Sequence, residues 1–538
     1  MMGPTMTRLP KNAYRWALYH LITQGDTDLF PIPFEIRALR YNWQPTVIEE
    51  LAKLELSTHQ WNAGRRFVVP KEEFTFRSAT QLDPLDSLIL AAIIRKYGQS
   101  IEDVRIPTSE GRVFSYRFDP QPDGRFYGQT SNWHEFWQAS LKKAKDGGCE
   151  WVAVADIADY YNQIYHHTLE NQIIESGVPA PVVRAIQGLL GTLTHGVSRG
   201  VPIGPHSVHL LAECSLIPVD RSLLSHGYDF CRYVDNIHLF CHSQEQARVA
   251  LQDVAEILDK QHRMIFQGRK TRIVPASEFV ELANSMLVDR PLNENEKKIL
   301  EVVNKYGTDD PYETVNIGKL DPEDRDALAE IKLVGLLELY LKPEQRNYPR
   351  IGWLLRRLSQ VGAPGVFDHV LRKIGDLMPV LSDVARYVVR SGPNYEGDAE
   401  LAGELVLEAL DLKAIGHNEY LRMILLNLFA EIPALDHINS LTATYGTASP
   451  PVRRELIVAA GTAKQGHWVK ERKEEFASAD PWLRRALIYA SKSLPGDEAD
   501  HWIKKTRGSM RSMEKLVVRW AFRNKNMKLG DVSITRNA

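Results

Sequence analysis

Two aspartates are the residues of this sequence best placed to hold a divalent cation. Asp156 ends the short apolar run 151–156, and Asp235 lies in a turn between two β-prone runs. Magnesium prefers hard oxygen ligands, which carboxylates on neighbouring strands can supply. Two cations roughly 4 Å apart suit nucleotidyl transfer, because one activates the attacking hydroxyl while the other holds the triphosphate. We therefore expect Asp156 and Asp235 to be catalytic metal ligands.

Two further groups adjoin these aspartates. The main-chain carbonyl of Ile157 is a candidate third ligand, and Asn236 follows Asp235 as a neutral, weaker auxiliary. Either aspartate alone has a structural alternative, since Asp at the end of a strand often caps a helix or turn. Together, with a Gly/Pro-rich segment between them, they favour a metal site.

Hydrophobic patterning indicates the elements that must position these residues. We expect a buried strand over 151–156 and a hairpin over 231–241. An amphipathic helix is expected over 244–261, with Ser243 as its N-cap and Gln246 completing a capping box.

The order of the motifs resembles that of a reverse transcriptase. The segment 156–166, Asp-Ile-Ala-Asp-Tyr-Tyr-Asn-Gln-Ile-Tyr-His, resembles the first palm motif of that family, especially of group II intron and bacterial enzymes. The resemblance implies that Tyr161 is the aromatic steric gate beneath the incoming sugar, which would select deoxynucleotides. An ordinary core tyrosine is the alternative.

The next two motifs each depart from the family pattern. The segment 198–207 resembles the motif written QGxPxSP, with Arg199 where Gln is usual, and the resemblance places Arg199, Gly200 and Pro202 at the dNTP. Glycine permits close backbone approach; for Arg199, a surface charge is the alternative to a phosphate or base contact. The segment 233–236 matches the YxDD box, with Asn236 replacing the second acid.

Three basic residues complete the resemblance. Lys270, in a Lys-Thr pair typical of a later palm motif, would lie near the triphosphate as a general acid for pyrophosphate. Lys71 and Arg77 resemble the finger segment that clamps phosphates, for which the guanidinium fork of Arg is suited. A solvated lysine is the alternative for Lys270 and for Lys71.

The resemblance implies an α+β fold with right-hand polymerase fingers and palm, followed by an all-α HEAT-like repeat domain. The predicted parts are an N-terminal helical extension (1–60), fingers and palm (61–286), a linker or thumb-like region (287–329) and the repeat domain with a basic C-terminal segment (330–538). The repeat rests on Arg422, Arg453 and Arg484, each 31 residues from the next in similar surroundings. An irregular helical bundle is the alternative.

The basic C-terminal segment is a further candidate nucleic-acid contact. Residues 501–530 carry nine Lys and Arg against one acid, Glu514. Such a stripe can bind phosphates; the alternative is the solvated face of a capping helix.

Composition argues against a strongly basic protein and against a membrane-spanning one. The net charge of −2 excludes a global polycation, and no apolar run reaches the ~20 residues of a membrane span. The four cysteines lack CxxC spacing, which favours reduced thiols in a cytoplasmic protein.

We therefore expect a DNA polymerase of the reverse-transcriptase class using Mg²⁺, with Mn²⁺ as an alternative. The layout resembles defence-associated (abortive-infection) reverse transcriptases, which implies antiphage defence, template-independent or protein-primed synthesis, and a homo-oligomer. Its partners would be dNTPs, the DNA product and a non-coding RNA or RNA template. Two other classes stay open: a group II intron-like or retron-like enzyme copying RNA, and a non-catalytic scaffold that binds RNA or a partner.

Overall fold

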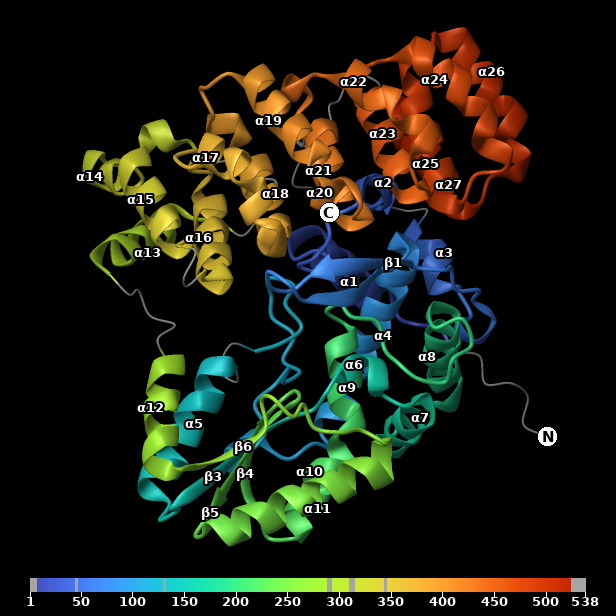
Figure 1. Ribbon diagram of the computed structural model, residues 1–538. Helices are drawn as coiled ribbons and strands as arrows, with labels where there is room; N and C mark the ends of the chain where they lie inside the picture. Colours follow the sequence, from blue (N-terminus) through green and yellow to red (C-terminus); the bar gives the residue numbers. More distant parts are fainter. Residues whose placement is uncertain are drawn as a thin grey trace, which may run out of the picture. The chain divides into compact units, whose positions relative to one another are not determined.

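The structure is a computed structural model that describes residues 7–43, 47–128, 132–287, 293–308, 315–342 and 346–523 (Figure 1). The chain divides into two compact units, and neither is continuous in sequence. The first consists of Met1–Thr27, Ile48–Gly64 and Thr80–Leu292, and the second of Asp28–Val47, Arg65–Ala79 and Asn293–Ala538. No helix among the described residues is long and apolar enough to cross a membrane.

The first unit combines helices with a four-stranded sheet. Its helices are α1 (Lys11–Thr23), α3 (Ile48–Ala52), α4 (Pro84–Glu102), α5 (Trp133–Asp146), α6 (Tyr160–Gln163), α7 (His166–Glu175), α8 (Ala180–Leu193), α9 (Val208–Ser215), α10 (Ile217–Ser225), α11 (Gln244–His262) and α12 (Ala276–Met286). Its strands are β3 (Trp151–Asp156), β4 (Asp229–Tyr233), β5 (Asn236–Cys241) and β6 (Arg272–Pro275).

The sheet has the order β4-β5-β3-β6, and each neighbouring pair is antiparallel. The predicted strand over 151–156 is confirmed as β3, and the predicted hairpin is confirmed as β4 and β5 joined by a two-residue turn. In the β3–β5 register, Asp156 lies opposite Asn236. The end of β3 and the turn that precedes β5 therefore lie side by side at one end of the two central strands.

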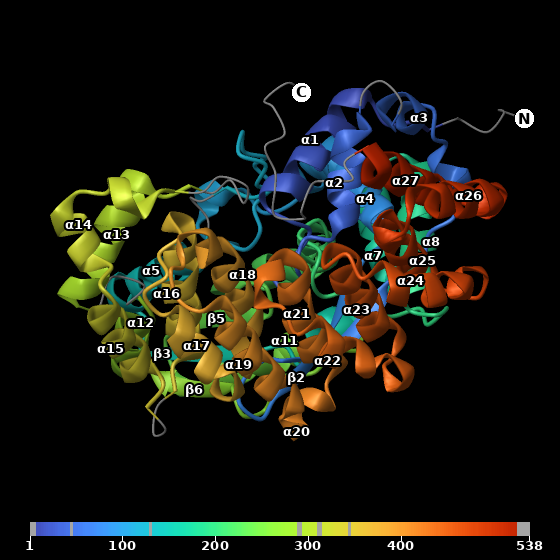
Figure 2. The same ribbon diagram turned by 90° about the horizontal axis from the view of Figure 1, so that it is seen from above.

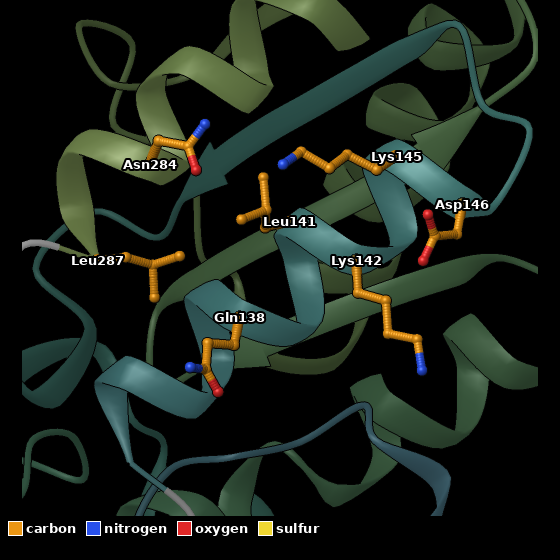
Figure 3. Close-up of a pocket in the computed structure, with 7 residues that line it drawn as sticks. All are labelled: Gln138, Leu141, Lys142, Lys145, Asp146, Asn284 and Leu287. Carbon is orange, nitrogen blue, oxygen red and sulfur yellow. The ribbon is translucent and has the colours of Figure 1, made fainter.

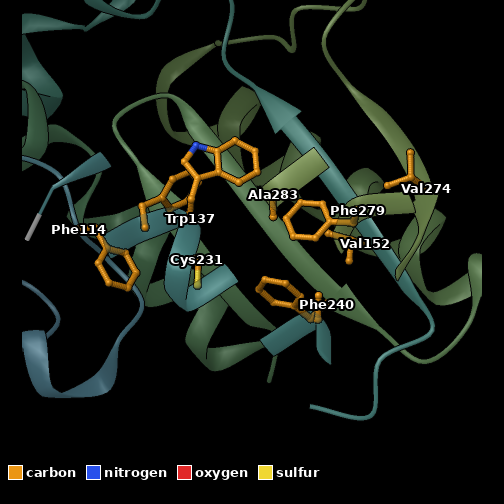
Figure 4. Packing of buried hydrophobic residues seen from close by; sticks show 10 residues of the cluster. Phe114, Trp137, Val152, Cys231, Phe240, Val274, Phe279 and Ala283 are labelled. Carbon is orange, nitrogen blue, oxygen red and sulfur yellow. The ribbon is translucent and has the colours of Figure 1, made fainter. Parts of the chain in front are cut away.

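Helices cover both faces of this sheet. On one face, Phe136 and Trp137 of α5 and Phe279 of α12 pack with Val152 and Phe240 in a buried cluster (Figure 4). Helix α11 packs against β3 and β5 on the other face (Figure 1). The predicted cap of α11 is confirmed, since Ser243 Oγ accepts a hydrogen bond from the Gln246 N–H at 3.1 Å. The sheet is thus fixed between apolar layers, while the polar residues Asp156 and Asn236 lie at the ends of its central strands.

Besides helices, the described part of the second unit contains β1 (Arg65–Pro70) and the beginning of β2 (Phe76–Gln81). The two strands pair with each other, and the last residues of β2 belong to the first unit. The helices of the second unit are α2 (Phe34–Tyr41), α13 (Glu294–Tyr306), α14 (Pro322–Ala327), α15 (Glu330–Tyr340), α16 (Tyr348–Val361), α17 (Phe367–Arg372), α18 (Leu381–Ser391), α19 (Ala399–Asp411), α20 (Lys413–Gly416), α21 (Glu419–Glu431), α22 (Ile438–Ala443), α23 (Pro450–Thr462), α24 (Gly466–Arg472), α25 (Pro481–Ala490), α26 (Gly496–Thr506) and α27 (Ser512–Arg523). The expected α+β class with an all-helical C-terminal region is confirmed.

Seven of these helices form a row in which each packs against the next. The row is α13, α16, α18, α21, α23, α25 and α27, which Figure 2 shows in yellow to red. Arg422, Arg453 and Arg484, the three equivalent positions of the 31-residue spacing, lie on α21, α23 and α25. The spacing is therefore the distance along the chain from α21 to α23 and from α23 to α25.

Buried charges join the N-terminal segment 28–47 to this row. Glu35 on α2 accepts hydrogen bonds from Arg454 at 2.8 Å and from Arg485 at 2.9 Å. Burial works to raise the pKa of the Glu35 carboxyl, but the charges of both arginines hold this pKa below its usual value. The partners of Glu35 thus lie more than 400 residues downstream in the chain.

Candidate active site

Asp156 and Asp235 come together through main-chain pairing of the strands that carry them. The N–H of Ile157, directly after Asp156, donates to the carbonyl of Asp235 at 2.9 Å. Asp156 is 6% exposed at the end of β3, and Asp235 occupies the turn between β4 and β5. Ile157 also forms an antiparallel bridge with Phe266, so its main chain lies between both site segments.

Asn236 supports the Asp235 carboxylate. The Asn236 amide nitrogen donates to Asp235 Oδ1 at 3.0 Å. An aspartate at position 236 would add a third negative charge to those of Asp156 and Asp235. The Asn236 amide instead donates a hydrogen bond to the Asp235 carboxylate. The substitution therefore lowers the negative charge of the site and leaves the amide oxygen as a neutral candidate ligand.

Lys270 lies at the Asp156 carboxylate. Its ammonium donates to Asp156 Oδ2 at 3.0 Å, and its side chain is 57% exposed. The turn that carries Lys270 is held to the same strand, since the Gln267 N–H donates to the Asp156 carbonyl at 2.7 Å. The charge of the Asp156 carboxylate is therefore paired with that of the Lys270 ammonium.

The donor set fits a hard divalent cation that also takes ligands from its substrate. Asp156 and Asp235 supply carboxylate oxygens, and Asn236 and the Ile157 carbonyl supply neutral ones. Among the residues that the structure describes, no group of three or more His, Cys, Asp or Glu could hold a metal ion. Magnesium is commonly bound by one or two carboxylates together with water and phosphate, so two carboxylates suffice.

A strained residue precedes Asp235. Val234 has φ of +53°, a left-handed conformation that β-branched residues rarely adopt. Hydrogen bonds hold both of its polar main-chain groups. Its N–H donates to Ser115 Oγ at 2.9 Å, and its carbonyl accepts from Arg232 Nη1 at 2.9 Å. Such strain persists where the surroundings fix the backbone, which is the case here.

Those two contacts belong to a buried ionic network beneath the turn. Arg232, fully buried, donates to Glu213 Oε2 at 3.0 Å and to Asp220 Oδ2 at 2.6 Å. Glu213 also accepts from Ser115 Oγ at 2.6 Å and from Arg105 at 2.8 Å. Burial works to raise the pKa of the Glu213 carboxyl, but the charges of Arg232 and Arg105 keep this pKa below its usual value.

The sequence interpretation missed this network. Part of its signal was available, because Glu213 is the one acidic residue of the largely apolar helix α9, and Arg232 follows the apolar residues Phe230 and Cys231. Charged residues at such positions are seldom buried unless they are paired. Their partners could not be assigned, because Ser115 and Glu213 are 98 residues apart.

Tyr161, the predicted steric gate, lies on α6 with its hydroxyl on a histidine. Tyr161 Oη and His209 Nδ1 are 2.7 Å apart, and the His209 ring stacks on Tyr116 with ring centroids 4.0 Å apart. Burial raises the pKa of Tyr161 well above its usual value, so its hydroxyl stays neutral. The Tyr161 carbonyl accepts from the Val201 N–H at 2.9 Å, which joins Tyr161 to the segment 198–207.

The segment 198–207 pairs with the chain after α6. Gly200, with φ of +95°, donates from its N–H to the Ile164 carbonyl at 2.8 Å, and Pro202 is buried beside it. The Arg199 guanidinium donates to Gln163 Oε1 at 2.9 Å and lies 4.3 Å from the centroid of the Tyr165 ring. Arg199 is thus half-buried and engaged within its own segment.

Lys71 and Arg77 belong to the second unit. Asp156, Asp235, Asn236 and Lys270 belong to the first unit. A surface hollow of about 520 Å³ between α5 and α12 lies apart from these four residues (Figure 3). It is lined by Gln138, Leu141, Lys142, Lys145, Asp146, Asn284 and Leu287, none of which is a predicted site residue.

A family model of known proteins matches most of the first unit. Residues 94–294 match the family model described as reverse transcriptase (RNA-dependent DNA polymerase), and they include Asp156, Tyr161, Asp235 and Lys270. The protein therefore contains a reverse-transcriptase domain, which confirms the resemblance at this level.

Two solved structures are similar to the chain. Telomerase from Candida albicans, in complex with a TWJ fragment of telomeric RNA, is 12% identical with a TM-score of 0.29; the match covers 77% of this chain and 71% of that one. Apo telomerase from Candida tropicalis is 10% identical with a TM-score of 0.34, covering 71% of this chain and 72% of that one. No curated protein matches the sequence.

Proposed function

We propose that the protein is a DNA polymerase that adds dNTPs to a growing strand by two-metal nucleotidyl transfer. The observation that carries this proposal is the β3–β5 register, which brings Asp156 opposite Asn236 at the turn holding Asp235. These residues lie within the segment that matches reverse transcriptases, and Lys270 contacts the same carboxylate.

In the proposed reaction, the 3′-oxygen of the strand bonds to the α-phosphorus of a dNTP while the bond to pyrophosphate breaks. Mg²⁺ held by Asp156 and Asp235 would lower the pKa of the attacking hydroxyl and neutralise charge on the triphosphate. The hydroxyl proton passes to water. Lys270, whose side chain is half-exposed beside Asp156, donates a proton to the departing pyrophosphate.

Tyr161 would select the sugar in this proposal. Its ring is held from two directions, by the His209 contact at its hydroxyl and by the Val201 bond to its carbonyl. A ring fixed in this way would clash with a 2′-hydroxyl and would therefore favour deoxynucleotides. Lys71, Arg77, Arg199, Gly200 and Pro202 stay candidate dNTP contacts on the motif resemblance, with Arg199 the weakest because its guanidinium is engaged by Gln163.

We infer further that the enzyme acts in antiphage defence as a cytoplasmic homo-oligomer. The support is the order of the parts, since the helical row follows the polymerase motifs as HEAT-like repeats do in the defence-associated enzymes that the sequence resembles. Template-independent or protein-primed synthesis belongs to the same inference. An RNA-copying enzyme is the competing function, favoured by the family description.

Incorporation of labelled dNTPs by the purified protein tests the proposal, with Mg²⁺ or Mn²⁺ and with or without an RNA template. We expect Asp235→Asn and Asp156→Asn each to lose about 10³-fold or more in rate, since a lost metal contact costs several kcal/mol of transition-state stabilisation. Asp159→Asn is the matched control, because Asp159 is an exposed neighbour whose left-handed φ of +50° Asn tolerates. Full activity in Asp235→Asn contradicts the proposal and favours the scaffold. Activity only with template identifies an RNA-copying enzyme.

A further inference from the structure

Helix α27 carries a row of four cations at intervals of four residues. They are Arg511, directly before the helix, and Lys515, Arg519 and Arg523 within it, and all four are exposed. We call these four residues the α27 cationic row. Residues four apart lie on one face of a helix, about 6 Å from one another along its axis. The row therefore forms a single line of positive charge about 18 Å long.

The opposite face of α27 fixes the direction of this row. Met513, Leu516, Val517, Trp520 and Ala521 are buried. The Trp520 ring stacks on Phe34 at 5.8 Å and on Tyr489 at 5.7 Å between ring centroids, and α27 packs against α25 and α2. Because the apolar face is held by rings of its own unit, the cationic row is held facing outward from the helix.

The one acid of α27 does not neutralise the row. Glu514 is 1% exposed, and its carboxylate accepts from Arg484 at 2.7 and 3.0 Å. Among the residues that the structure describes, no carboxylate lies within ion-pair distance of the four row side chains. Three further exposed cations, Lys504, Lys505 and Arg507, precede the row on α26 and the turn after it.

An ordinary solvated face has a different charge pattern. Solubility is served by both signs interspersed, as on α13, where Lys297 and Lys298 alternate with exposed Glu294 and Glu301. A capping helix needs only a polar outer face. Four cations in one line are more than a polar outer face requires. They are the pattern expected of a surface that binds a linear polyanion. Lys525 and Lys528, which continue the basic segment, lie outside the described residues.

We propose that the α27 cationic row binds the phosphodiester backbone of a single nucleic-acid strand. A single line of charge matches one backbone, whereas a duplex presents two. The identity of that strand as the DNA that the enzyme makes rests on the proposed function, but the binding itself does not.

The test is fluorescence anisotropy of a labelled 20-nucleotide oligothymidylate at several salt concentrations, without metal or dNTP. The row variant is R511Q/K515Q/R519Q/R523Q. The control is K297Q/K298Q/K319Q/K342Q, which removes the same charge from exposed lysines of the same unit. Each phosphate contact with a single strand contributes about 0.7 to the steepness of log K against log salt. The row variant, which lacks four cations, should therefore have a slope that is shallower by about 3. Its affinity at low salt should fall about tenfold or more while the control matches the unmodified protein.

Three results would overturn the proposal: an unchanged slope in the row variant, an equal loss in the control, or tighter binding of a duplex than of the single strand. Row-dependent binding to phosphatidylserine vesicles without row-dependent binding to oligothymidylate would also overturn it. The Asp235→Asn protein separates this proposal from the polymerase proposal. If it retains full dNTP incorporation while the row variant loses the slope, the polymerase assignment fails and the strand-binding surface stands.

Discussion

The hydroxyl of Ser115 accepts a hydrogen bond from the N–H of Val234 at 2.9 Å and donates one to Glu213 at 2.6 Å. A single buried oxygen thus connects the backbone beside Asp235 to the ionic network below it. The left-handed conformation of Val234 depends on this contact and on the Arg232 bond to its carbonyl. We therefore expect Ser115 and Arg232 to act as positioning residues, through the main chain of Val234.

Ser115→Ala should raise the Mg²⁺ concentration needed for half-maximal incorporation. The variant leaves the Val234 N–H without its partner, which costs about 1–3 kcal/mol of unfolding free energy, and lets the Asp235 turn relax. Ser140→Ala is the matched control, because Ser140 is equally buried in the same unit but bonds to His238 at 2.9 Å. Urea unfolding measures stability, and a metal titration of activity measures positioning. Equal shifts in metal requirement for both variants would show that Ser115 acts only through stability.

Lys270→Met should lower the rate of incorporation by about 10²-fold, the usual contribution of a general acid. Stability should change by less than about 1 kcal/mol, because the Lys270 side of its ion pair with Asp156 is half-exposed to solvent. Single-turnover kinetics with saturating dNTP separates chemistry from binding. Arg269→Met, at the exposed neighbouring position, is the control. A rate equal to that of the unmodified enzyme would reduce Lys270 to a surface contact.

Replacing Tyr161 should separate the bulk of its ring from the role of its hydroxyl. Tyr161→Ala removes the ring and should raise ribonucleotide use about tenfold or more, since rejection by sterics is lost. Tyr161→Phe keeps the ring and loses only the His209 contact, so it should retain most discrimination. The measurement is the ratio of kcat/KM for a dNTP and the matching rNTP. Unchanged ratios in both variants would assign Tyr161 to the core instead.

The stability of the first unit should fall as the pH drops below about 6.5. Burial lowers the pKa of His238 and of His20 to about 3, and that of His262 to about 4. An unfolded histidine binds a proton near pH 6.5, so between pH 6.5 and about 4 the unfolded state holds more protons. Each such histidine costs about 1.4 kcal/mol per pH unit in that window.

Urea unfolding between pH 4 and pH 7 checks this dependence. In His238→Gln, the slope of unfolding free energy against pH should decrease by the amount that one proton contributes. His167→Gln, at an exposed position, should leave the slope unchanged. An identical slope in His238→Gln and the unmodified protein would mean that His238 charges in the folded state.

Local patterning predicted the elements that carry the aspartates. The strand over 151–156, the hairpin and the cap of α11 follow from alternation of apolar residues and from one Ser–Gln pair, all of which are local signals. The order of motifs predicted the reverse-transcriptase domain for the same reason, since each motif is contiguous. The β3–β5 register, which places Asp156 opposite Asn236, is known only from the structure, because it joins strands about 80 residues apart.

The contacts that could not be predicted join residues that lie far apart in the sequence. Ser115 and Val234 are separated by 119 residues, and no property of Ser115 in sequence distinguishes it from other serines. Arg199 was left open between phosphate and surface, and its contact with Gln163 depends on a turn at Gly200 that sequence does not specify. The division into units was equally hidden, since Glu35 meets Arg454 only in three dimensions.

The pairing of Glu35 with Arg454 and Arg485 has a consequence for synthesis on the ribosome. The carboxylate emerges 419 residues before its first partner. At about 5–20 residues per second, Glu35 and its helix wait roughly 20–80 s before they can be buried. During that time the apolar side of α2 remains available to chaperones, and the second unit acquires its N-terminal part only when the last helices leave the exit tunnel.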